Sequence, residues 1–403
     1  MFNLNMPVDS TFLSESIYEG ILRYLVHGGN MKEAFQYTYQ SRILTRNGTP
    51  IGILPLAGND LSVKKGDRYE IRFPEKVLLL LNPSRISEEL IKKWIDEKKT
   101  VKDLLSKDFV ENIISSNYVS QFHTDLKNIS IKIEKNDMNI GGDELTGPQI
   151  LKVDRYTGIT SLEEKYADKT ITLRFSRDAM LLLLLGIYSS YIIFDKPYIY
   201  FLFFSPDEVL YILSTPKEEA ERLLYSYFLI KDRTVEKVRE ILRGLVVNEI
   251  LFLELALSID LQMLMSRESI DRISMILFKI AKEGNTYKIY EQLPITIYRE
   301  PSFYKVLKKY VRDPIKFCEN ISRELLPNKP ILRALRSFSS KNKFTEADNI
   351  LRAIQGLYNF IVIGNPAGFL QFYREIYNAY NKLASKKEER ANYYLRLLSR
   401  LMW

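Results

Sequence analysis

The stretch from Ala179 to Phe204 reads AMLLLLLGIYSSYIIFDKPYIYFLFF, and its only charged residues are Asp195 and Lys196. A membrane-spanning helix needs roughly 20 consecutive apolar residues, and the run before Asp195 is shorter than that. A helix that is apolar nearly all round is typical of a protein core, and Tyr198–Phe204 is typical of a buried strand. The stretch therefore predicts a buried helix followed by a strand at the centre of a folded domain.

Length and composition indicate a folded protein of more than one domain. The chain has 403 residues, and its hydrophobic share of 46% and charged share of 27% are near globular averages. One domain typically has about 150 residues. Cys318 is the only cysteine, so disulfides cannot hold the fold, and a zinc site built from cysteines is excluded unless a partner supplies ligands. Met1–Asp9 lacks the pattern of a secretory signal, and we expect a soluble, cytoplasmic protein without a membrane segment.

Residue usage indicates a thermophilic source. Glutamine is scarce, whereas Lys, Arg, Glu, Ile and Tyr are plentiful. Proteins of hyperthermophiles change in this direction because ion-pair networks replace amides that heat degrades.

Helix and strand signals alternate through the first half of the chain. The apolar spacing after Ser10 predicts a helix that ends at Gly28 and Gly29, because glycine adopts the left-handed backbone that terminates helices. Further helices are expected at Met31–Tyr39, Glu88–Glu97 and Val101–Ile114. Short strands are expected at Ile51–Leu56, Arg68–Phe73, Val77–Leu81, Ile129–Ile133, Ile150–Val153 and Thr170–Phe175.

The second half is predicted to be almost wholly helical. Long amphipathic helices are expected at Pro216–Ile230, Thr234–Met265 and Glu268–Ala281. Thr286–Tyr290 and Ile295–Tyr298 flank Leu293 and Pro294, which predicts a short hairpin or paired extended segments. Two apolar stripes near the end of the chain predict a helix bundle, one running from Phe344 to Ile361 and the other from Phe369 to Leu383.

These patterns predict an α+β protein in three parts. Residues 1–205 are expected to form a mixed α/β domain with small sheets. Residues 206–330 are expected to form a helical domain with a short hairpin, and residues 331–403 a basic C-terminal helical bundle.

Positive charge is concentrated at the C-terminus. Residues 331–403 contain 12 Lys or Arg and 5 Asp or Glu, whereas residues 1–330 contain 46 and 45. Basic helices that also carry tyrosine can neutralise phosphates and stack on bases. Arg374, Lys382, Arg396 and Arg400 are therefore candidate nucleic-acid contacts, with Tyr373, Tyr377 and Tyr393 beside them. The alternatives are a solvated face of the bundle and a surface that docks on an acidic protein.

A second basic cluster lies between residues 42 and 68, where only Asp60 and Asp67 oppose the cations and the net charge is +3. Turn signals separate its members, and loops at a sheet edge can enter a groove or hold a phosphate backbone. An asparagine there could hydrogen-bond to base edges. The candidate contacts are Arg42, Arg46, Asn59, Lys64, Lys65 and Arg68. Ordinary polar turns are the alternative.

No motif supports a catalytic centre, a metal site or a cofactor. Gly141–Leu145 reads GGDEL and is similar to the metal-binding hairpin of nucleotide cyclases, but a turn follows it and no partner acidic pair precedes it, which favours a surface turn. His27 and His123 are the only histidines, too few for a three-histidine metal site, and His27 is interpreted as a helix cap. The chain contains no phosphate-binding loop of the G-x-x-x-x-G-K-[ST] kind.

Three features together resemble the large subunit of archaeal type I-A CRISPR interference complexes (Cascade). They are Tyr198–Ser205 leading into Pro206-Asp207-Glu208, the segment Glu283–Glu291, and the basic bundle at the C-terminus. The resemblance extends loosely over the whole chain.

The resemblance implies a non-catalytic subunit of an RNA-guided DNA surveillance complex. Such a subunit sits at the 5′ end of the CRISPR RNA (crRNA), reads the protospacer-adjacent motif in duplex DNA and helps to recruit the nuclease. Its implied partners are crRNA, target DNA and the other Cascade subunits, namely the backbone subunit, the small subunit, the helicase and the nuclease. Base pairing supplies most of the specificity, so the protein needs basic and amide side chains and no catalytic residues. A helical adaptor for an acidic protein and an enzyme built around the Gly141 turn are the other two hypotheses.

Overall fold

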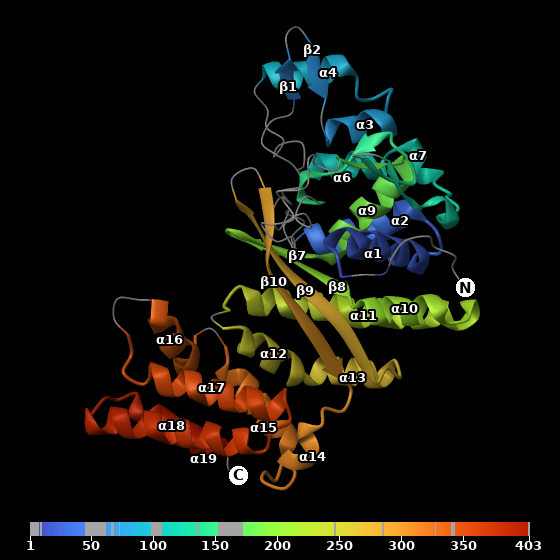
Figure 1. Cartoon of the computed structure of the whole chain (residues 1–403). Coiled ribbons are helices and arrows are strands. Elements are labelled where there is room, and N and C mark those ends of the chain that lie inside the picture. Colours follow the sequence, from blue (N-terminus) through green and yellow to red (C-terminus); the bar gives the residue numbers. More distant parts are fainter. Residues whose placement is uncertain are drawn as a thin grey trace. The chain divides into compact units, whose positions relative to one another are not determined.

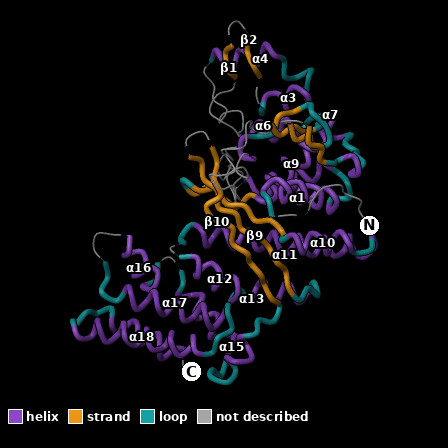
Figure 2. Tube along the Cα trace, in the orientation of Figure 1, coloured by secondary structure: helices purple, strands orange, loops and turns teal. Residues whose placement is uncertain are grey.

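The computed structural model describes residues 8, 10–44, 62–65, 68–71, 73–97, 107–134, 137–151, 172–245, 247–283, 286–326, 328–339 and 343–401. The chain forms two compact units. The first contains Met1–Phe228 and Ser274–Pro294, and the second contains Leu229–Ile273 and Ile295–Trp403. Figure 1 and Figure 2 show that the described residues after 298 form helices, whereas the strands come from residues 62–298, which confirms the α+β class.

Two helices pack against each other at the centre of the first unit. Helix α1 (Phe12–Val26) is capped by the Thr11 side chain, and α9 (Arg177–Ser190) is capped by Ser176. They cross where Gly20 of α1 meets Gly186 of α9. The backbones are so close there that a Cβ on Gly20 would lie 1.8 Å from the Leu182 carbonyl oxygen. From Ala179 to Ser190 every residue of α9 is buried, which confirms the predicted core helix. None of the described helices is both long enough and apolar enough to cross a membrane.

A four-stranded sheet packs on this helix pair in the order β10-β9-β8-β7. Its strands are β7 (Tyr191–Asp195), β8 (Tyr198–Phe204), β9 (Arg272–Glu283) and β10 (Thr286–Tyr298). Phe201 and Phe203 of β8 contact Phe12 of α1 at ring-centroid distances of 5.0 and 5.6 Å. Phe204 points to the opposite face, since side chains alternate along a strand, and it contacts Phe228 of α11 (Lys217–Leu242).

The rest of the first unit consists of short elements. A second sheet has the order β3-β4-β6-β5, with β4 and β6 parallel. Its strands are β3 (Ile131–Glu134), β4 (Asp137–Ile140), β5 (Leu145–Thr146) and β6 (Thr172–Phe175), and the pair β1 (Ser62–Lys65) and β2 (Arg68–Ile71) forms a third sheet. The helices are α2 (Met31–Thr38), the π-helix Tyr39–Ile43, α3 (Glu75–Leu81), α4 (Glu88–Asp96), α6 (Lys107–Ile114), α7 (Asn117–Ser120) and α10 (Pro206–Ser214).

The second unit is a helical assembly around one apolar core. Its helices include α12 (Asn248–Ala256), α13 (Ile259–Arg267), α14 (Phe303–Leu307), α15 (Pro314–Glu324), α16 (Pro330–Arg336), α17 (Ala347–Ile361), α18 (Ala367–Ser385) and α19 (Ala391–Leu401). Helices α17 and α18 meet closely at two glycines, because a Cβ on Gly368 would lie 2.4 Å from the Gly356 carbonyl oxygen. Both predicted apolar stripes face this core, with Ile354 and Phe372 almost completely buried.

Four predicted elements have a different structure. Thr234–Met265 was predicted as one helix, but it covers the end of α11, all of α12 and most of α13. Val77–Leu81 was predicted as a strand and lies in α3, because its leucine run follows Pro74 and favours a helix. Glu268–Ala281 was predicted as a helix, but most of it is β9, which pairs with β8 from Tyr198↔Ala281 to Phe204↔Met275. The spacing of its apolar residues fits both a helix and a strand, and pairing with β8 selects the strand. Ile150 lies in a short 3-10 turn instead of a strand, and Ile51–Leu56 lies outside the described residues.

The hairpin also differs from its prediction and changes how the chain is grouped. Thr286–Tyr290 and Ile295–Tyr298 form the single strand β10, which pairs with β9. Pro294 is tolerated because β10 is an edge strand and need not donate on its outer side. Because β9 continues the sheet begun by β8, residues 274–294 belong with the N-terminal residues, and the two units differ from the three consecutive domains predicted.

Candidate nucleic-acid interface

Helices α18 and α19 present four predicted contact residues to solvent. On α18, Phe372, Ile376 and Leu383 are buried in the core, and Arg374 and Lys382 are exposed. On α19 the spacing of Arg396 and Arg400 is one helical turn, so both lie on the exposed side while the buried residues Tyr394, Leu397 and Leu401 face inward. The same amphipathic pattern that buries the bundle core therefore exposes these cations.

The two helix arginines nearest to carboxylates remain largely accessible. The Arg374 side chain is 69% exposed and its Nε lies 3.3 Å from Glu375 Oε1, whereas the Arg400 side chain is 63% exposed and lies 3.8 Å from Glu324 Oε1. Burial alone would raise the pKa of Glu375, but hydrogen bonds from Asn349, Asn378 and Arg374 outweigh it and hold the pKa below its usual value. Each arginine thus has one anchoring contact and keeps guanidinium surface for a ligand.

The tyrosines beside these cations do not all face solvent. The Tyr373 hydroxyl donates to the Leu401 carbonyl oxygen at 2.8 Å, and the Tyr393 hydroxyl donates to Glu324 at 2.5 Å. Burial raises the pKa of both phenols, and for Tyr393 the neighbouring Glu324 raises it further. Only Tyr377, at 52% exposure, is available to stack on a base. The predicted stacking role of Tyr373 and Tyr393 is wrong, since both rings help to close the bundle.

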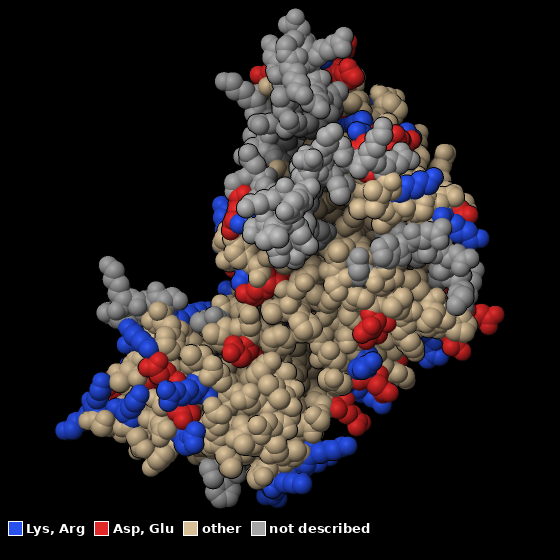
Figure 3. All heavy atoms as spheres, viewed as in Figure 1, with Lys and Arg blue, Asp and Glu red and all other residues tan. Residues whose placement is uncertain are grey.

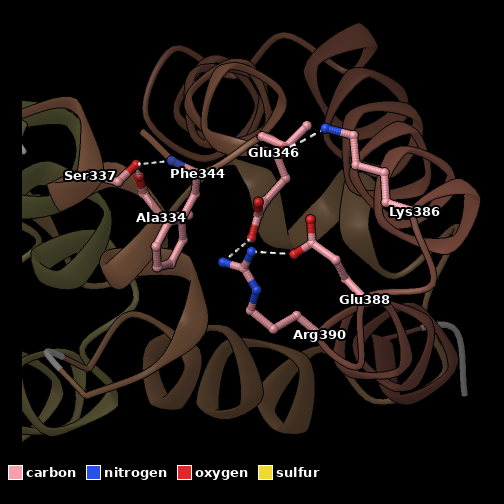
Figure 4. A network of polar contacts seen from close by, with 8 residues as sticks. Ala334, Ser337, Phe344, Glu346, Lys386, Glu388 and Arg390 are labelled. Carbon is pink, nitrogen blue, oxygen red and sulfur yellow. Dashed lines mark hydrogen bonds and ion pairs between the residues drawn. The ribbon is translucent and has the colours of Figure 1, made fainter. Parts of the chain in front are cut away.

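Other cations of the bundle contact groups of the bundle itself (Figure 4). The buried Glu346 carboxylate accepts from Arg390 Nη1 at 3.1 Å, and Arg390 also pairs with Glu388. The Arg390 guanidinium lies over the Phe344 ring at 4.1 Å. Lys386 donates to the Thr345 hydroxyl at 3.2 Å. This network ties the α18–α19 turn to the start of α17, so Arg390 has a structural role.

The predicted loop cluster around residue 42 is only partly described. Arg42 is 1% exposed, and its Nε donates to the Ser189 carbonyl oxygen at 2.9 Å. Its assignment as a nucleic-acid contact is corrected, because it lies in the core beneath α9. Lys64 and Lys65 lie on β1 and Arg68 on β2, in a register that pairs Lys65 with Arg68. Arg46 and Asn59 lie outside the described residues.

The GGDEL segment forms a turn that supports α9. Gly141 has a φ of +68°, and a Cβ there would lie 2.7 Å from the Ser176 hydroxyl oxygen. The Glu144 carboxylate accepts from the Arg177 backbone N–H at 2.9 Å, at the start of α9. His27 ends α1, as predicted. In the described part of the chain no three His, Cys, Asp or Glu side chains are grouped so that they could hold a metal ion.

The two segments that carry the resemblance to the CRISPR subunit meet in one sheet. The rings of Tyr198 on β8 and Tyr290 on β10 are 5.3 Å apart, and the Lys279 ammonium on β9 lies 4.4 Å from the Tyr198 ring centre. Lys279 also pairs with Glu291 at 3.1 Å. Burial, then the charges of Asp195 and Glu291, raise the pKa of Tyr200 to about 12, so this phenol stays neutral. The resemblance therefore falls on a local structural cluster of tyrosine rings and paired charges.

Comparison with known proteins identifies a relative of full length. The chain is 38% identical over 414 residues to a protein of Archaeoglobus fulgidus named "Uncharacterized protein", and the match covers 99% of each chain. The chain belongs to the family of this archaeal protein. No family model matches it, and no solved structure does. The relative's name assigns no activity.

In this member of the family, the charge is divided between the two units more sharply than the sequence analysis indicated. The second unit contains 27 Lys or Arg and 17 Asp or Glu, whereas the first contains 31 and 33. Residues 331–403 supply most of the excess, and residues 295–330 add to it with 8 cations and 4 acids. The count over residues 1–330 concealed the positive charge of residues 295–330. A count in shorter windows would have found this basic segment.

Proposed function

We propose that the protein is a non-catalytic, cytoplasmic subunit of a CRISPR RNA-guided DNA surveillance complex, and that its second unit binds nucleic acid through exposed cations. The assignment to the large subunit of type I-A Cascade rests on the resemblance described above. In this role the chain contributes to recognition of the protospacer-adjacent motif, to target DNA binding and to recruitment of the nuclease. Its partners are crRNA, target DNA and the other Cascade subunits.

One observation carries the proposal of nucleic-acid binding: the exposed cations of α18 and α19 lie on a packed helical surface, and the carboxylates that contact Arg374 and Arg400 are buried. Arg374 and Arg400 each contact one buried carboxylate and remain mostly exposed. Lys382 and Arg396 have no ion pair with another described residue. Cations held in place by a packed bundle can contact phosphates without first being ordered, which lowers the entropic cost of binding.

Figure 3 shows where these charges gather on the second unit. Lys and Arg side chains cluster around the α18–α19 turn, and another group lies over the α14 region. Contacts of this kind bind phosphate without reading sequence. Recognition of a short DNA motif would then fall to other residues, and Arg46, Asn59, Lys64, Lys65 and Arg68 of the first unit stay our candidates for it.

The second hypothesis is a helical adaptor that docks on an acidic protein. The same cations would serve, but an adaptor would not lose affinity for oligonucleotides when salt is raised. The exposed Tyr377, between Arg374 and Lys382 in the sequence of α18, favours nucleic acid, because a ring among cations can stack on bases.

Reversing the four exposed cations of the bundle tests the proposal. We expect R374E/K382E/R396E/R400E, assembled with crRNA and the other subunits, to bind every target duplex more weakly, whatever its flanking motif. If all four side chains contact phosphates, the slope of log K against log salt falls by about 3.6 on duplex DNA. The measurement is filter binding or fluorescence anisotropy over a salt series.

A matched variant tests whether the effect depends on where the charges lie or only on the net charge of the protein. K32E/K76E/K92E/K127E makes the same change in charge at exposed residues of the first unit and is expected to keep the wild-type salt slope. The double variant K382E/R396E leaves the contacts to Glu375 and Glu324 intact and serves if the fourfold variant assembles poorly. Equal slopes for the wild type and both bundle variants would refute DNA binding by this surface.

A further inference from the structure

The chain that joins α14 to α15 carries a dense set of exposed cations. Helical hydrogen bonds continue past α14, since the Val311 N–H donates to the Leu307 carbonyl oxygen at 2.8 Å. Phe303, Leu307 and Val311 recur at every fourth position and are buried in the core. The opposite, exposed side holds Lys305, Lys308, Lys309 and Arg312, and Lys316 follows in the first turn of α15.

These five side chains are not neutralised by their surroundings. None of them forms an ion pair with another residue in the described ranges. Asp313 is the only acid between Lys305 and Lys316, and its carboxylate accepts from the Lys316 backbone N–H at 3.0 Å as the cap of α15. Like charges this close repel one another, and that repulsion is relieved when an anion binds. The segment therefore has a strong local preference for a polyanion.

An exposed aromatic ring lies in the middle of the cations. Tyr310 is 53% exposed, and its ring centre is 5.4 Å from that of Phe369 with an angle of 30° between the planes. Phe369 is in turn held by Phe360 at 5.1 Å and by Phe317 at 5.9 Å. One face of the tyrosine is therefore supported by the core, and the ring keeps a large accessible surface.

We propose that the segment Lys305–Lys316 binds single-stranded nucleic acid, with its cations on the phosphates and a base stacked on Tyr310. Unpaired bases expose their faces to aromatic side chains, which duplex DNA does not, and the backbone of the strand supplies the anionic partners. An acidic protein would satisfy the cations but would leave the supported ring without a role. The inference deepens the function proposed above, on which it rests only for the biological source of the strand.

Binding of short oligonucleotides by the full chain tests this site directly. The probes are fluorescein-labelled 20-mers of deoxythymidine and of uridine, which distinguish a DNA site from an RNA site, and the readout is anisotropy over a salt series. We expect the variant K308E/K309E/R312E to lose at least tenfold in affinity at low salt. Its salt slope is expected to fall by about 2.1, because each phosphate contact contributes about 0.7 on a single strand.

Tyrosine variants and a charge-matched control make the test specific. Y310A is expected to bind about tenfold more weakly, which corresponds to about 1.4 kcal/mol, with an unchanged salt slope. Y310F keeps the ring face and is expected to bind within about twofold of the wild type. K32E/K76E/K92E makes the same change in charge as the triple variant at exposed residues of the first unit and is expected to bind normally.

Three results would overturn this site. The first is wild-type affinity in K308E/K309E/R312E. The second is equal affinity of Y310A and the wild type. The third is binding of poly-L-glutamate through these cations without binding of either oligonucleotide, which would assign the surface to an acidic protein. If this site fails while the α18–α19 variants still weaken target binding by the assembled complex, the proposed function stands without it.

Discussion

Replacing Gly186 with Ala is expected to lower the free energy of unfolding by about 3 kcal/mol or more. A Cβ at this position would lie 1.7 Å from the Ser16 carbonyl oxygen, and the mirror contact at Gly20 is equally short. The nearby atoms belong to helix backbones, so α1 and α9 would have to move apart, and the loss of close packing would extend along the whole helix pair. Urea unfolding followed by circular dichroism measures the change.

A second Gly→Ala substitution serves as the control for the first. Gly28 has a φ of +62°, and a Cβ there would meet no atom within 4 Å. G28A therefore has only the cost of the left-handed backbone, about 1 kcal/mol. Equal losses in G28A and G186A would mean that the helices do not cross as closely as the structure shows.

Replacing Arg23 with Met is expected to lower the free energy of unfolding by about 3–5 kcal/mol, because it removes a buried cation that is linked through Ser189 to a buried carboxylate. Arg23 is almost completely buried, and its Nε donates to the Ser189 hydroxyl at 2.8 Å. The same hydroxyl donates to Glu19 Oε1 at 2.6 Å, which links the two charges through Ser189. The guanidinium also lies over the Phe228 ring at 3.9 Å. Chemical denaturation measures the loss.

A double-mutant cycle with Glu19→Gln determines whether the two charges act together. We expect E19Q/R23M to lose less stability than the sum of the two single variants, because the two residues are linked through Ser189 and each single change already breaks that link. Arg222 is an exposed arginine of the same unit, and R222M is expected to change stability by no more than about 0.5 kcal/mol. Strict additivity in the cycle would show that Glu19 and Arg23 are independent.

The sequence predicted those elements whose period and end signals agree. The α1 helix ends at Gly28 and Gly29 as expected, and the apolar run after Ala179 gives the core helix and the strand β8. The apolar spacing of β9 fits both a helix and a strand. Its pairing with β8 determines the structure, and the local sequence does not reveal that pairing.

The candidate interface shows what a charge count can and cannot predict. It correctly placed Arg374, Lys382, Arg396 and Arg400 on exposed helix faces. A charge count could not distinguish these exposed cations from Arg390 and Arg42, which contact groups inside the protein. The sequence alone does not reveal which carboxylate or carbonyl group lies near a given arginine. The cations at Lys305–Lys316 were missed, since averaging over 330 residues cancelled them against distant acids.

The most direct test of the central proposal, that the second unit binds nucleic acid, is photocrosslinking of the assembled complex to target DNA that carries 4-thiothymidine, followed by peptide mapping. We expect crosslinked peptides from residues 295–401, above all those that contain Tyr310 and those from α18 and α19. Crosslinks confined to the first unit, with none from residues 295–401, would contradict the proposal.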